Sequence, residues 1–313
     1  KKKQGQKDQL YEVPAASADR QLLWFIITGL MFSDPNITLH YLRKRPVMLA
    51  WWIFHRLTSA WRAVPGFIIV GVQKGGTTSL FQYLSRHPNM LPPFRKEIKY
   101  FDFNYTLGMG WYQANFPLRK KLAGNNAITG DASPNYIFHP DGAIRIAQSL
   151  PATRIIALLR NPVDRAYSHY HRMVEEGLED LSFEGAIEAE EERLGQEAMR
   201  VNADGIRPRD EYFNHSYLAR GRYIEQVPGL FEAFPRENIL LLKSEDLFTR
   251  TAEIYHETLA FLGLPQLDLP RYKASNQRRN EPMNKKTRKK LVDYFARFNE
   301  NLYQYLHRDF GWE

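Results

Sequence analysis

A short apolar run that ends in a glycine-rich loop constrains the fold of this chain more than any other feature. Residues 67–70 read Phe-Ile-Ile-Val, a pattern typical of a buried strand, and residues 71–80 read GVQKGGTTSL. A helix is expected from Thr77 to Arg86. Glycines let backbone N–H groups converge on one anion, and the N-terminus of a helix adds partial positive charge. The strand, loop and helix together therefore predict a binding site for a phosphate-type anion.

Two further apolar runs, residues 154–159 (RIIALL) and 238–243 (NILLLK), are each followed by a helical pattern. Buried strands that alternate with helices indicate an α/β fold with a parallel sheet. We expect a P-loop-like three-layer fold over residues 66–313, with a central parallel sheet flanked by helices. Residues 285–306 are predicted to form the last helix. The glutamate-rich residues 175–197 are predicted to form a solvated helical face.

The position of the lysine distinguishes this loop from the phosphate loop of nucleotide triphosphatases. In that motif, G-x-x-x-x-G-K-[ST], a lysine directly precedes the Ser or Thr that binds magnesium. Gly71 and Gly76 keep the glycine spacing, but Thr77 occupies the lysine position and the lysine is Lys74. No strand ends in an obvious magnesium-binding aspartate, and Asp131 is the nearest candidate. We therefore expect anion binding without a metal, and an ATP-dependent kinase is the alternative of a different class.

A second anion site is predicted after the apolar run 154–159. Arg160 follows this run, where ligands bind in open α/β sheets, and Ser168 lies further along the next helix. A guanidinium and a hydroxyl held together can bind a phosphate. Two anion sites on two βα turns indicate a ligand with two phosphate-like ends. The residues predicted for the first site are Lys74, Gly75, Gly76, Thr77, Thr78 and Ser79.

At these segments the sequence resembles the sulfotransferases that use 3′-phosphoadenosine 5′-phosphosulfate (PAPS). Residues 71–80 resemble their 5′-phosphosulfate loop, and residues 159–170 (LRNPVDRAYSHY) resemble their 3′-phosphate motif, with Arg160 and Ser168 in the binding positions. The loop is closer to the glycan-modifying branch, the heparan sulfate sulfotransferases, than to the cytosolic aryl and steroid branch. The resemblance covers residues 66–313. It implies transfer of a sulfuryl group from PAPS, with 3′-phosphoadenosine 5′-phosphate (PAP) as product.

The resemblance also implies a catalytic base. Transfer to an acceptor hydroxyl is an in-line displacement, which a base and a cation assist. Residues 96–102 (KEIKYFD) resemble the segment in which the heparan sulfate branch carries its glutamate base, so Glu97 takes that role. Lys74 would assist the leaving phosphate. The cytosolic branch uses a histidine instead, and the histidines near the motifs are His87, His139, His169 and His171.

Two positions depart from the heparan sulfate branch. The active-site lysine of its E-K-[ST]-P motif falls on Ala132 in this chain, and its disulfide is absent because there is no cysteine. Both departures weaken the case for a heparan acceptor in particular and leave sulfuryl transfer untouched. We expect the acceptor to be a carbohydrate hydroxyl. A lipid or another small-molecule alcohol stays open as an acceptor.

The basic charge of the chain is concentrated in one segment. The net charge is +8, from 43 Lys and Arg against 35 Asp and Glu, and residues 271–290 alone contribute +8. The remaining charges cancel, and only Tyr272 could stack on a base within the segment, so a nucleic-acid partner is not expected. In the family the corresponding region covers the cofactor, which makes Arg278 and Arg279 predicted contacts, with Lys273 as the alternative. Residues 285–290 could equally form a solvated face.

Residues 1–65 are expected to form an N-terminal tail and a helical extension. Two apolar runs, residues 22–32 and 46–54, are shorter than the roughly 20 residues that a membrane-spanning helix needs. We expect them to be helices packed on a globular domain. Peripheral membrane contact through residues 21–60 is the alternative, because the runs are rich in tryptophan and flanked by Arg and Lys.

The absence of cysteine excludes disulfides, Cys-ligated zinc and thiol nucleophiles. It fits a reducing compartment, so the expected location is the cytoplasm, including the periphery of a membrane. The first residue is Lys1, not Met, which leaves the Golgi lumen as the alternative if an N-terminal anchor has been removed.

Overall fold

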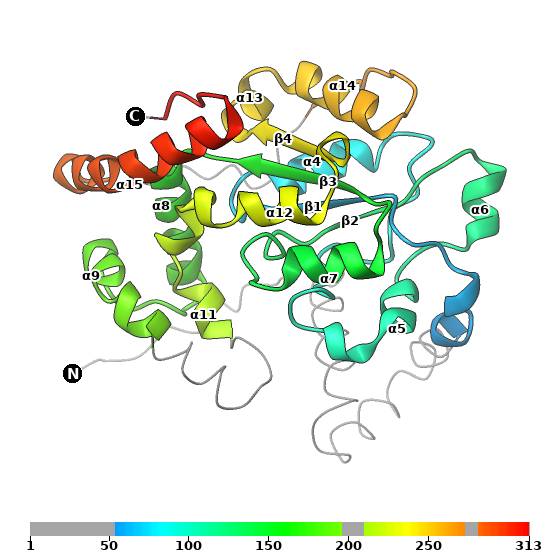
Figure 1. The fold of residues 1–313 in the computed structure, drawn as a ribbon, viewed down its shortest axis with the longest axis horizontal. Coiled ribbons are helices and arrows are strands. Elements are labelled where there is room, and N and C mark those ends of the chain that lie inside the picture. Colours follow the sequence, from blue (N-terminus) through cyan, green and yellow to red (C-terminus); the bar gives the residue numbers. More distant parts are fainter. Residues whose placement is uncertain (1–53, 196–209, 273–280, 313) are drawn as a thin grey trace, which may run out of the picture. The chain divides into compact units, whose positions relative to one another are not determined.

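The computed structural model describes residues 54–195, 210–272 and 281–312. The chain divides into two compact units, residues 1–57 and 58–313. The second unit contains the sheet and the helices that bear on function (Figure 1).

Most of the expected N-terminal extension lies outside the described residues. Residues 54–57 are helical, and a 3-10 turn, η1, covers Ser59–Trp61. The expected cofactor contacts Arg278 and Arg279, and the alternative Lys273, also lie outside the described residues. Within the part of the chain that the structure describes, no helix has the length and apolar character needed to span a membrane.

Four parallel strands form the central sheet in the order β2-β1-β3-β4, which confirms the expected parallel sheet. Because β1 is paired with both β2 and β3, the turns that follow β1 and β3 leave the sheet side by side at its carboxyl edge. The two turns predicted to bind anions are therefore neighbours. The strands are β1 (Phe67–Gly71), β2 (Gly130–Ala132), β3 (Arg154–Leu159) and β4 (Ile239–Lys243).

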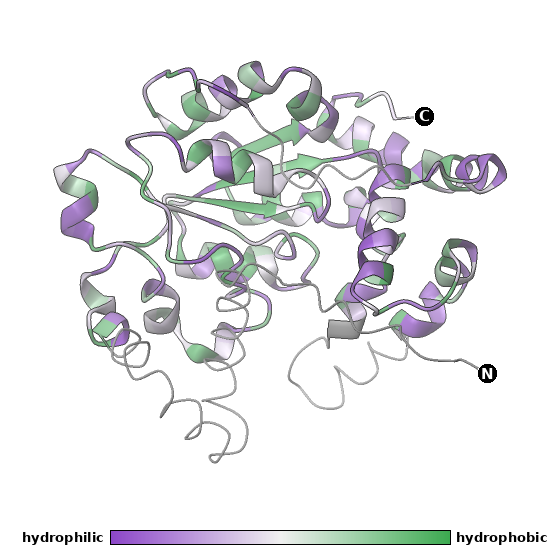
Figure 2. Ribbon diagram, turned by 180° about the vertical axis from the view of Figure 1, so that it is seen from behind, coloured by the Kyte–Doolittle hydropathy of each residue, from purple (hydrophilic) through white to green (hydrophobic). Residues whose placement is uncertain are grey.

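Helices cover both faces of the sheet, which confirms the three-layer arrangement and explains why the strands are apolar throughout (Figures 1 and 2). Successive side chains of a strand point to opposite faces. Ile68 and Val70 of β1 therefore enter one hydrophobic cluster, whereas Phe67 and Ile69 enter the other. The first cluster includes side chains of α5 (Met109–Gln113), α7 (Gly142–Ser149) and α12 (Val227–Ala233), and the second those of α4 (Thr77–Leu84), α13 (Ser244–Thr249) and α14 (Thr251–Leu262).

Helix α8 follows β3 and begins at a strong N-cap. The side chain of Asn161 accepts hydrogen bonds from the N–H groups of Val163 and Asp164, and Pro162 occupies the first helical position. A third hydrophobic cluster joins α8 (Pro162–Glu175) to α9 (Phe183–Glu188) and to α15 (Lys285–Leu306), the last helix, whose range is the predicted one. The other elements are α6 (Arg119–Gly124), α11 (Asp210–Asn214), η2 (Tyr105–Leu107), η3 (Ala219–Gly221), η4 (Tyr223–Glu225) and η5 (Arg236–Asn238).

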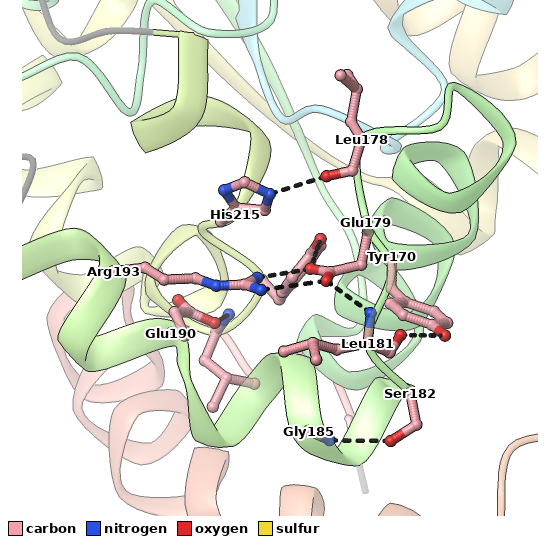
Figure 3. A network of polar contacts seen from close by, with 11 residues as sticks. Tyr170, Leu178, Glu179, Leu181, Ser182, Gly185, Glu190, Arg193 and His215 are labelled. Carbon is pink, nitrogen blue, oxygen red and sulfur yellow. Dashed lines mark hydrogen bonds and ion pairs between the residues drawn. The ribbon is translucent and has the colours of Figure 1, made fainter.

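The prediction of a solvated helical face at residues 175–197 is confirmed only in part: residues 183–188 and 190–195 are helical and most of their glutamates are exposed, but two glutamates of the range are buried. Glu179 and Glu190 are only 5% and 4% exposed, and a loop separates α8 from α9. Glu179 accepts two hydrogen bonds from the guanidinium of Arg193, at 2.7 and 3.2 Å (Figure 3). It also accepts one from the hydroxyl of Tyr217 at 2.8 Å. Composition counts charges, but it does not reveal partners that approach from elsewhere in the chain.

These two carboxylates fix the segment that leads into η3. Glu190 accepts the backbone N–H groups of Leu218 and Ala219 at 2.6 and 2.8 Å, and His215 contacts the carbonyl of Leu178 at 3.0 Å. Burial raises the pKa of Glu190, and the two amide donors oppose this rise. The segment therefore has a fixed position where it passes the pocket described below.

Candidate active site

The loop between β1 and α4 has a backbone that few residues other than glycine can adopt. Gly76 has φ of 90°, and Lys74 itself lies in the left-handed region with φ of 69°. A Cβ atom on Gly75 would lie 2.7 Å from the carbonyl oxygen of Leu158, so the loop packs directly on β3. The hydroxyl of Ser244 donates to the carbonyl of Gly75 at 2.6 Å. The loop is therefore held closely by its neighbours.

Helix α4 directs its N-terminus toward an open space. Thr77, Thr78 and Ser79 form its first turn and line a pocket of about 410 Å³. The first N–H groups of a helix have no acceptor within the helix, and the helix dipole makes this end partly positive. Together with Lys74, which lines the same pocket, this arrangement can attract an anion.

Arg160 joins the second βα turn to the first. Its guanidinium donates to the carbonyl of Lys74 at 2.9 Å, and the hydroxyl of Tyr223 donates to the carbonyl of Arg160 at 2.8 Å. Ser168, two turns into α8, lines the same pocket as Arg160 and Lys74. The two sets of residues predicted to bind separate anions therefore lie in a single pocket.

Glu97 comes from a third segment and also lines this pocket. Its side chain is 42% exposed, and its Oε1 lies 2.8 Å from the ammonium of Lys96. Desolvation alone would raise the pKa of Glu97, but the ammonium of Lys96, its hydrogen bond, and the charges of Lys99 and Arg172 lower this pKa below 4.5. The carboxylate is therefore ionised at neutral pH and able to accept a proton.

Eight of the predicted residues line the pocket, namely Lys74, Gly76, Thr77, Thr78, Ser79, Glu97, Arg160 and Ser168. Gly75 lies in the loop without lining the pocket. The other lining residues were not predicted from the sequence. They are Gln73, Lys99, Phe103, Pro134, Asn135, Arg172, Met173, Glu176, Phe213, Asn214, Arg220 and Phe248. Two of them could have been predicted from the sequence. Arg172 and Glu176 follow Ser168 at intervals of four residues, so all three lie on the same side of α8 and its C-cap.

Arg220 is the buried cation of the pocket. Its guanidinium lies 4.7 Å from the ring of Phe138 and 5.1 Å from that of Phe213, and it donates to the side-chain oxygen of Asn135 at 2.8 Å. Burial lowers the pKa of Arg220 to about 9, with the charge of Arg165 adding to the decrease. Arg220 therefore adds a further positive charge to a pocket that Lys74 also lines.

Asp131, the nearest magnesium candidate in the sequence, is fully buried and does not line the pocket. Its carboxylate accepts hydrogen bonds from the hydroxyls of Ser133, Tyr136 and Tyr112 at 3.1, 2.9 and 3.2 Å. Burial raises its pKa, and these hydroxyl donors oppose the rise. Across the described ranges, no group of three or more His, Asp or Glu side chains is placed to hold a metal ion.

The residues that line the pocket do not include any of the four candidate histidines. His169 is fully buried in α8, and desolvation holds its pKa well below the usual range. Burial, together with Arg145, lowers the pKa of His139 to about 4. His87 contacts the carbonyl of Pro265 at 3.0 Å. His139 nevertheless stacks on the pocket residue Phe213, with ring centres 6.3 Å apart.

Side chains of residues 285–290 pair with carboxylates. Arg288 lies 2.7 Å from Asp164, and Lys289 lies 2.9 Å from Asp293. Lys290 pairs with Glu188 at 3.3 Å. For residues 285–290, these ion pairs favour the alternative of a solvated helical face over contact with a cofactor.

Asp102 follows Glu97 in the same segment, and its buried carboxyl has a pKa raised to about 7, mainly by desolvation. The carboxyl therefore contributes stability that is complete below pH 3.8 and is lost as the pH rises through 7. Asp102→Asn keeps an acceptor for the N–H of Phe103 but cannot ionise. We expect its advantage in unfolding free energy over the wild type to grow from pH 4 to 7, to at most about 4 kcal/mol. Urea denaturation across this range measures it, and a constant difference would contradict the expectation.

Comparison with known proteins is consistent with this geometry. A family model described as a sulfotransferase domain matches residues 65–301. The chain is 29% identical over 315 residues to the membrane-associated sulfotransferase kil1 of Dictyostelium discoideum, with 80% of this chain and 67% of that protein covered. It is 26% identical to the heparan sulfate glucosamine 3-O-sulfotransferase 3B1 of Mus musculus, with 80% and 66% covered.

A bifunctional heparan sulfate N-deacetylase/N-sulfotransferase 1 of Caenorhabditis elegans is 24% identical over 79% of this chain, which spans only 30% of that protein. Among solved structures, a sulfotransferase from Alicyclobacillus acidocaldarius superposes with a TM-score of 0.62 at 31% identity. The superposition covers 79% of this chain and 97% of the chain from Alicyclobacillus acidocaldarius. The residues matched by the family model, 65–301, include the four strands and the residues that line the pocket.

Proposed function

Because the chain belongs to the sulfotransferase domain family, we propose that it transfers a sulfuryl group from PAPS to a carbohydrate hydroxyl. The observation that supports this most is one pocket lined by residues of three separate segments. Lys74 comes from the loop after β1, Arg160 and Ser168 come from the turn and helix after β3, and Glu97 comes from the segment between α4 and β2. This is a set of two anion sites with a base beside them.

The residues of the pocket fit a donor that carries two phosphate-type groups. The first turn of α4 and Lys74 would hold the 5′-phosphosulfate, and Arg160 with Ser168 would hold the 3′-phosphate. Gly75 and Gly76 leave the loop without side chains that would collide with β3 and α13. When bound, PAPS supplies the sulfuryl group, and its 5′-phosphate is the leaving group.

We assign the proton of the acceptor hydroxyl to Glu97. Lys96 occupies Oε1 of this carboxylate, so Oε2 is the oxygen that we expect to accept the proton as the new O–S bond forms. Lys74 donates to the oxygen on which negative charge grows as the old S–O bond breaks. The lowered pKa of Glu97 favours the ionised form that this role needs.

The acceptor side of the pocket combines aromatic rings with polar groups. Phe103 and Phe213 have ring centres 4.9 Å apart, and the ammonium of Lys99 lies 5.2 Å from the ring of Phe103. Arg220 lies 5.1 Å from the ring of Phe213 and donates to Asn135 at 2.8 Å, and both Arg220 and Asn135 line the pocket. Ring faces together with several hydrogen-bonding groups suit a sugar ring, and two relatives have names that specify heparan sulfate. These features support a carbohydrate acceptor.

Calorimetry with PAP tests the donor assignment. We expect PAP to bind with micromolar affinity, and ATP with magnesium to bind at least tenfold more weakly. Arg160→Ala should weaken PAP binding by about 10–100-fold, because it removes a charged donor to a phosphate. The control is Arg288→Ala, whose guanidinium pairs with Asp164 outside the pocket lining. No binding at high micromolar PAP, or equal binding of ATP, would end the proposal.

A panel of acceptors with labelled PAPS tests the second half of the proposal. It contains desulfated heparan sulfate oligosaccharides, octyl glucoside and a long-chain alcohol, and mass spectrometry locates the transferred group. We expect sulfate on a sugar hydroxyl. Transfer to the alcohol alone would replace the carbohydrate by a lipid or small-molecule acceptor.

A further inference from the structure

The segment that carries Glu97 has a strained backbone. Glu97 and Lys99 lie in the left-handed region, with φ of 58° and 54°, although neither is glycine. Such residues cost about 1–3 kcal/mol each and persist only where their surroundings hold them. The contacts that hold this segment therefore decide where the carboxylate of Glu97 points.

Two backbone amides of the segment are held by hydroxyl groups. The N–H of Lys99 donates to the hydroxyl of Ser133 at 3.2 Å, and the N–H of Tyr100 donates to the hydroxyl of Tyr136 at 2.8 Å. Both hydroxyls in turn donate to the buried carboxylate of Asp131, at 3.1 and 2.9 Å. The two chains of hydrogen bonds thus meet at one residue.

The carboxylate sets the direction of both chains. A hydroxyl has one hydrogen, and an ionised carboxylate can only accept. Because Ser133 and Tyr136 each give their hydrogen to Asp131, their oxygens face the amides of Lys99 and Tyr100 as acceptors. Asp131 therefore governs two contacts that it does not make itself.

Asp131 also links this segment to the glycine loop. It lies in β2, where its register partner is Ile68 of β1, and the N–H of Ser133 donates to the carbonyl of Ile69 at 3.1 Å. Strand β1 leads directly into the loop that carries Lys74. The pair of strands β1 and β2 thus supports both the segment that carries Glu97 and the glycine loop that carries Lys74.

We propose that Asp131 is a positioning residue for the reaction, which acts through Ser133 and Tyr136 to hold Glu97 against the pocket. The proposal rests on the assignment of Glu97 as the base. Asp131 does not line the pocket and touches no reacting group. Its effect must therefore appear in the step that Glu97 assists and not in cofactor binding.

The structure provides a matched pair of variants. Tyr136 and Tyr112 both donate to the same oxygen of Asp131, Oδ2, and both are fully buried. Of these two hydroxyls, only that of Tyr136 accepts a hydrogen bond from the N–H of Tyr100. Tyr136→Phe therefore breaks a chain to the base segment, whereas Tyr112→Phe removes a similar hydroxyl beside the same carboxylate.

We expect Tyr136→Phe to lower kcat by about 10–100-fold, because a small misplacement of a catalytic group has effects of this size. Tyr112→Phe should stay within about threefold of the wild type, and both variants should bind PAP with unchanged affinity. Ser133→Ala removes the other chain and repeats the test if Tyr136→Phe does not fold. The assay uses the acceptor that the labelled panel identifies.

Two measurements need no acceptor. Hydrogen exchange of the Tyr100 amide should accelerate in Tyr136→Phe and not in Tyr112→Phe. The titration of the Glu97 carboxyl carbon, followed by NMR, should move toward that of an ordinary glutamate in Tyr136→Phe only. Equal behaviour of the two variants in exchange and titration would overturn the proposal.

A double-variant cycle separates this proposal from the assignment of the base. If Asp131 acts through Glu97, Tyr136→Phe should cause no further loss in a Glu97→Gln background under single-turnover conditions. An undiminished loss in that background would refute positioning through Glu97. Full turnover of Glu97→Gln alone would instead refute the base, while the exchange data would still report whether the two chains hold the segment.

Discussion

Replacing Glu97 with glutamine is expected to lower turnover by about 10²–10⁴-fold and to leave PAP binding intact. The amide has nearly the shape of the carboxylate but cannot take the proton of the acceptor hydroxyl. The anion loop and Arg160 are on other segments, so the cofactor contacts persist. Steady-state kinetics and PAP calorimetry on the same preparation measure both effects.

Glu176→Gln is the control for this substitution. Glu176 also lines the pocket and, as the C-cap of α8, pairs with Arg172 in the last turn of that helix. We expect its kcat to remain within a few-fold of the wild type, since it is not assigned the proton. A large loss of kcat in Glu176→Gln, together with full activity in Glu97→Gln, would identify Glu176 as the base instead of Glu97.

The pH dependence adds a check on the same residue. Protonation inactivates a base, and Lys96, Lys99 and Arg172 lower the pKa of Glu97 below 4.5 against the opposing effect of desolvation. The acid limb of kcat/KM should therefore lie below pH 4.5, with no loss of activity between pH 5.5 and 7. A limb near pH 7 would instead match Asp102, whose pKa is about 7.

Lys74→Met should lower kcat by about 10²–10³-fold, the usual effect of removing one donor to a developing negative charge. Methionine keeps an unbranched side chain of similar length and removes the ammonium. PAP affinity should fall as well, because the first turn of α4 then holds the 5′-phosphate without this charge. Kinetics with labelled PAPS and calorimetry separate the two effects.

Lys289→Met makes the same chemical change on an exposed face, where the lysine pairs with Asp293. This variant should behave as the wild type in both measurements. Weakened PAP binding with unchanged kcat in Lys74→Met would make Lys74 a binding residue and not a participant in transfer.

The local elements of the fold could be predicted from sequence because their signals are local. The apolar runs in β1 and β3 are buried on both faces, and a glycine loop or a capping Asn161 follows each of them. The residues expected to bind two anions belong to these same short segments. Helix α15 was predictable over its whole length from its composition.

The remaining parts of the site depend on contacts between distant segments. Arg220 enters the pocket from η3 and stacks on Phe138 and Phe213, and no local pattern marks it. Asp131 looked like a metal ligand candidate in sequence, but its oxygens are occupied by hydroxyls in the interior. Glu179 and Glu190 were likewise predicted to be surface charges, but in the structure they are buried hydrogen-bond acceptors.

By itself, the sequence determined the two turns that are predicted to bind anions, since a glycine loop and a helix start need only neighbouring residues to form. Only the tertiary structure decided that these turns share one pocket with Glu97, because strand order and side-chain packing set distances between segments. It also decided the contacts of the segment that carries Glu97. The amides of Lys99 and Tyr100 in this segment donate to Ser133 and Tyr136, which lie more than thirty positions away in the chain.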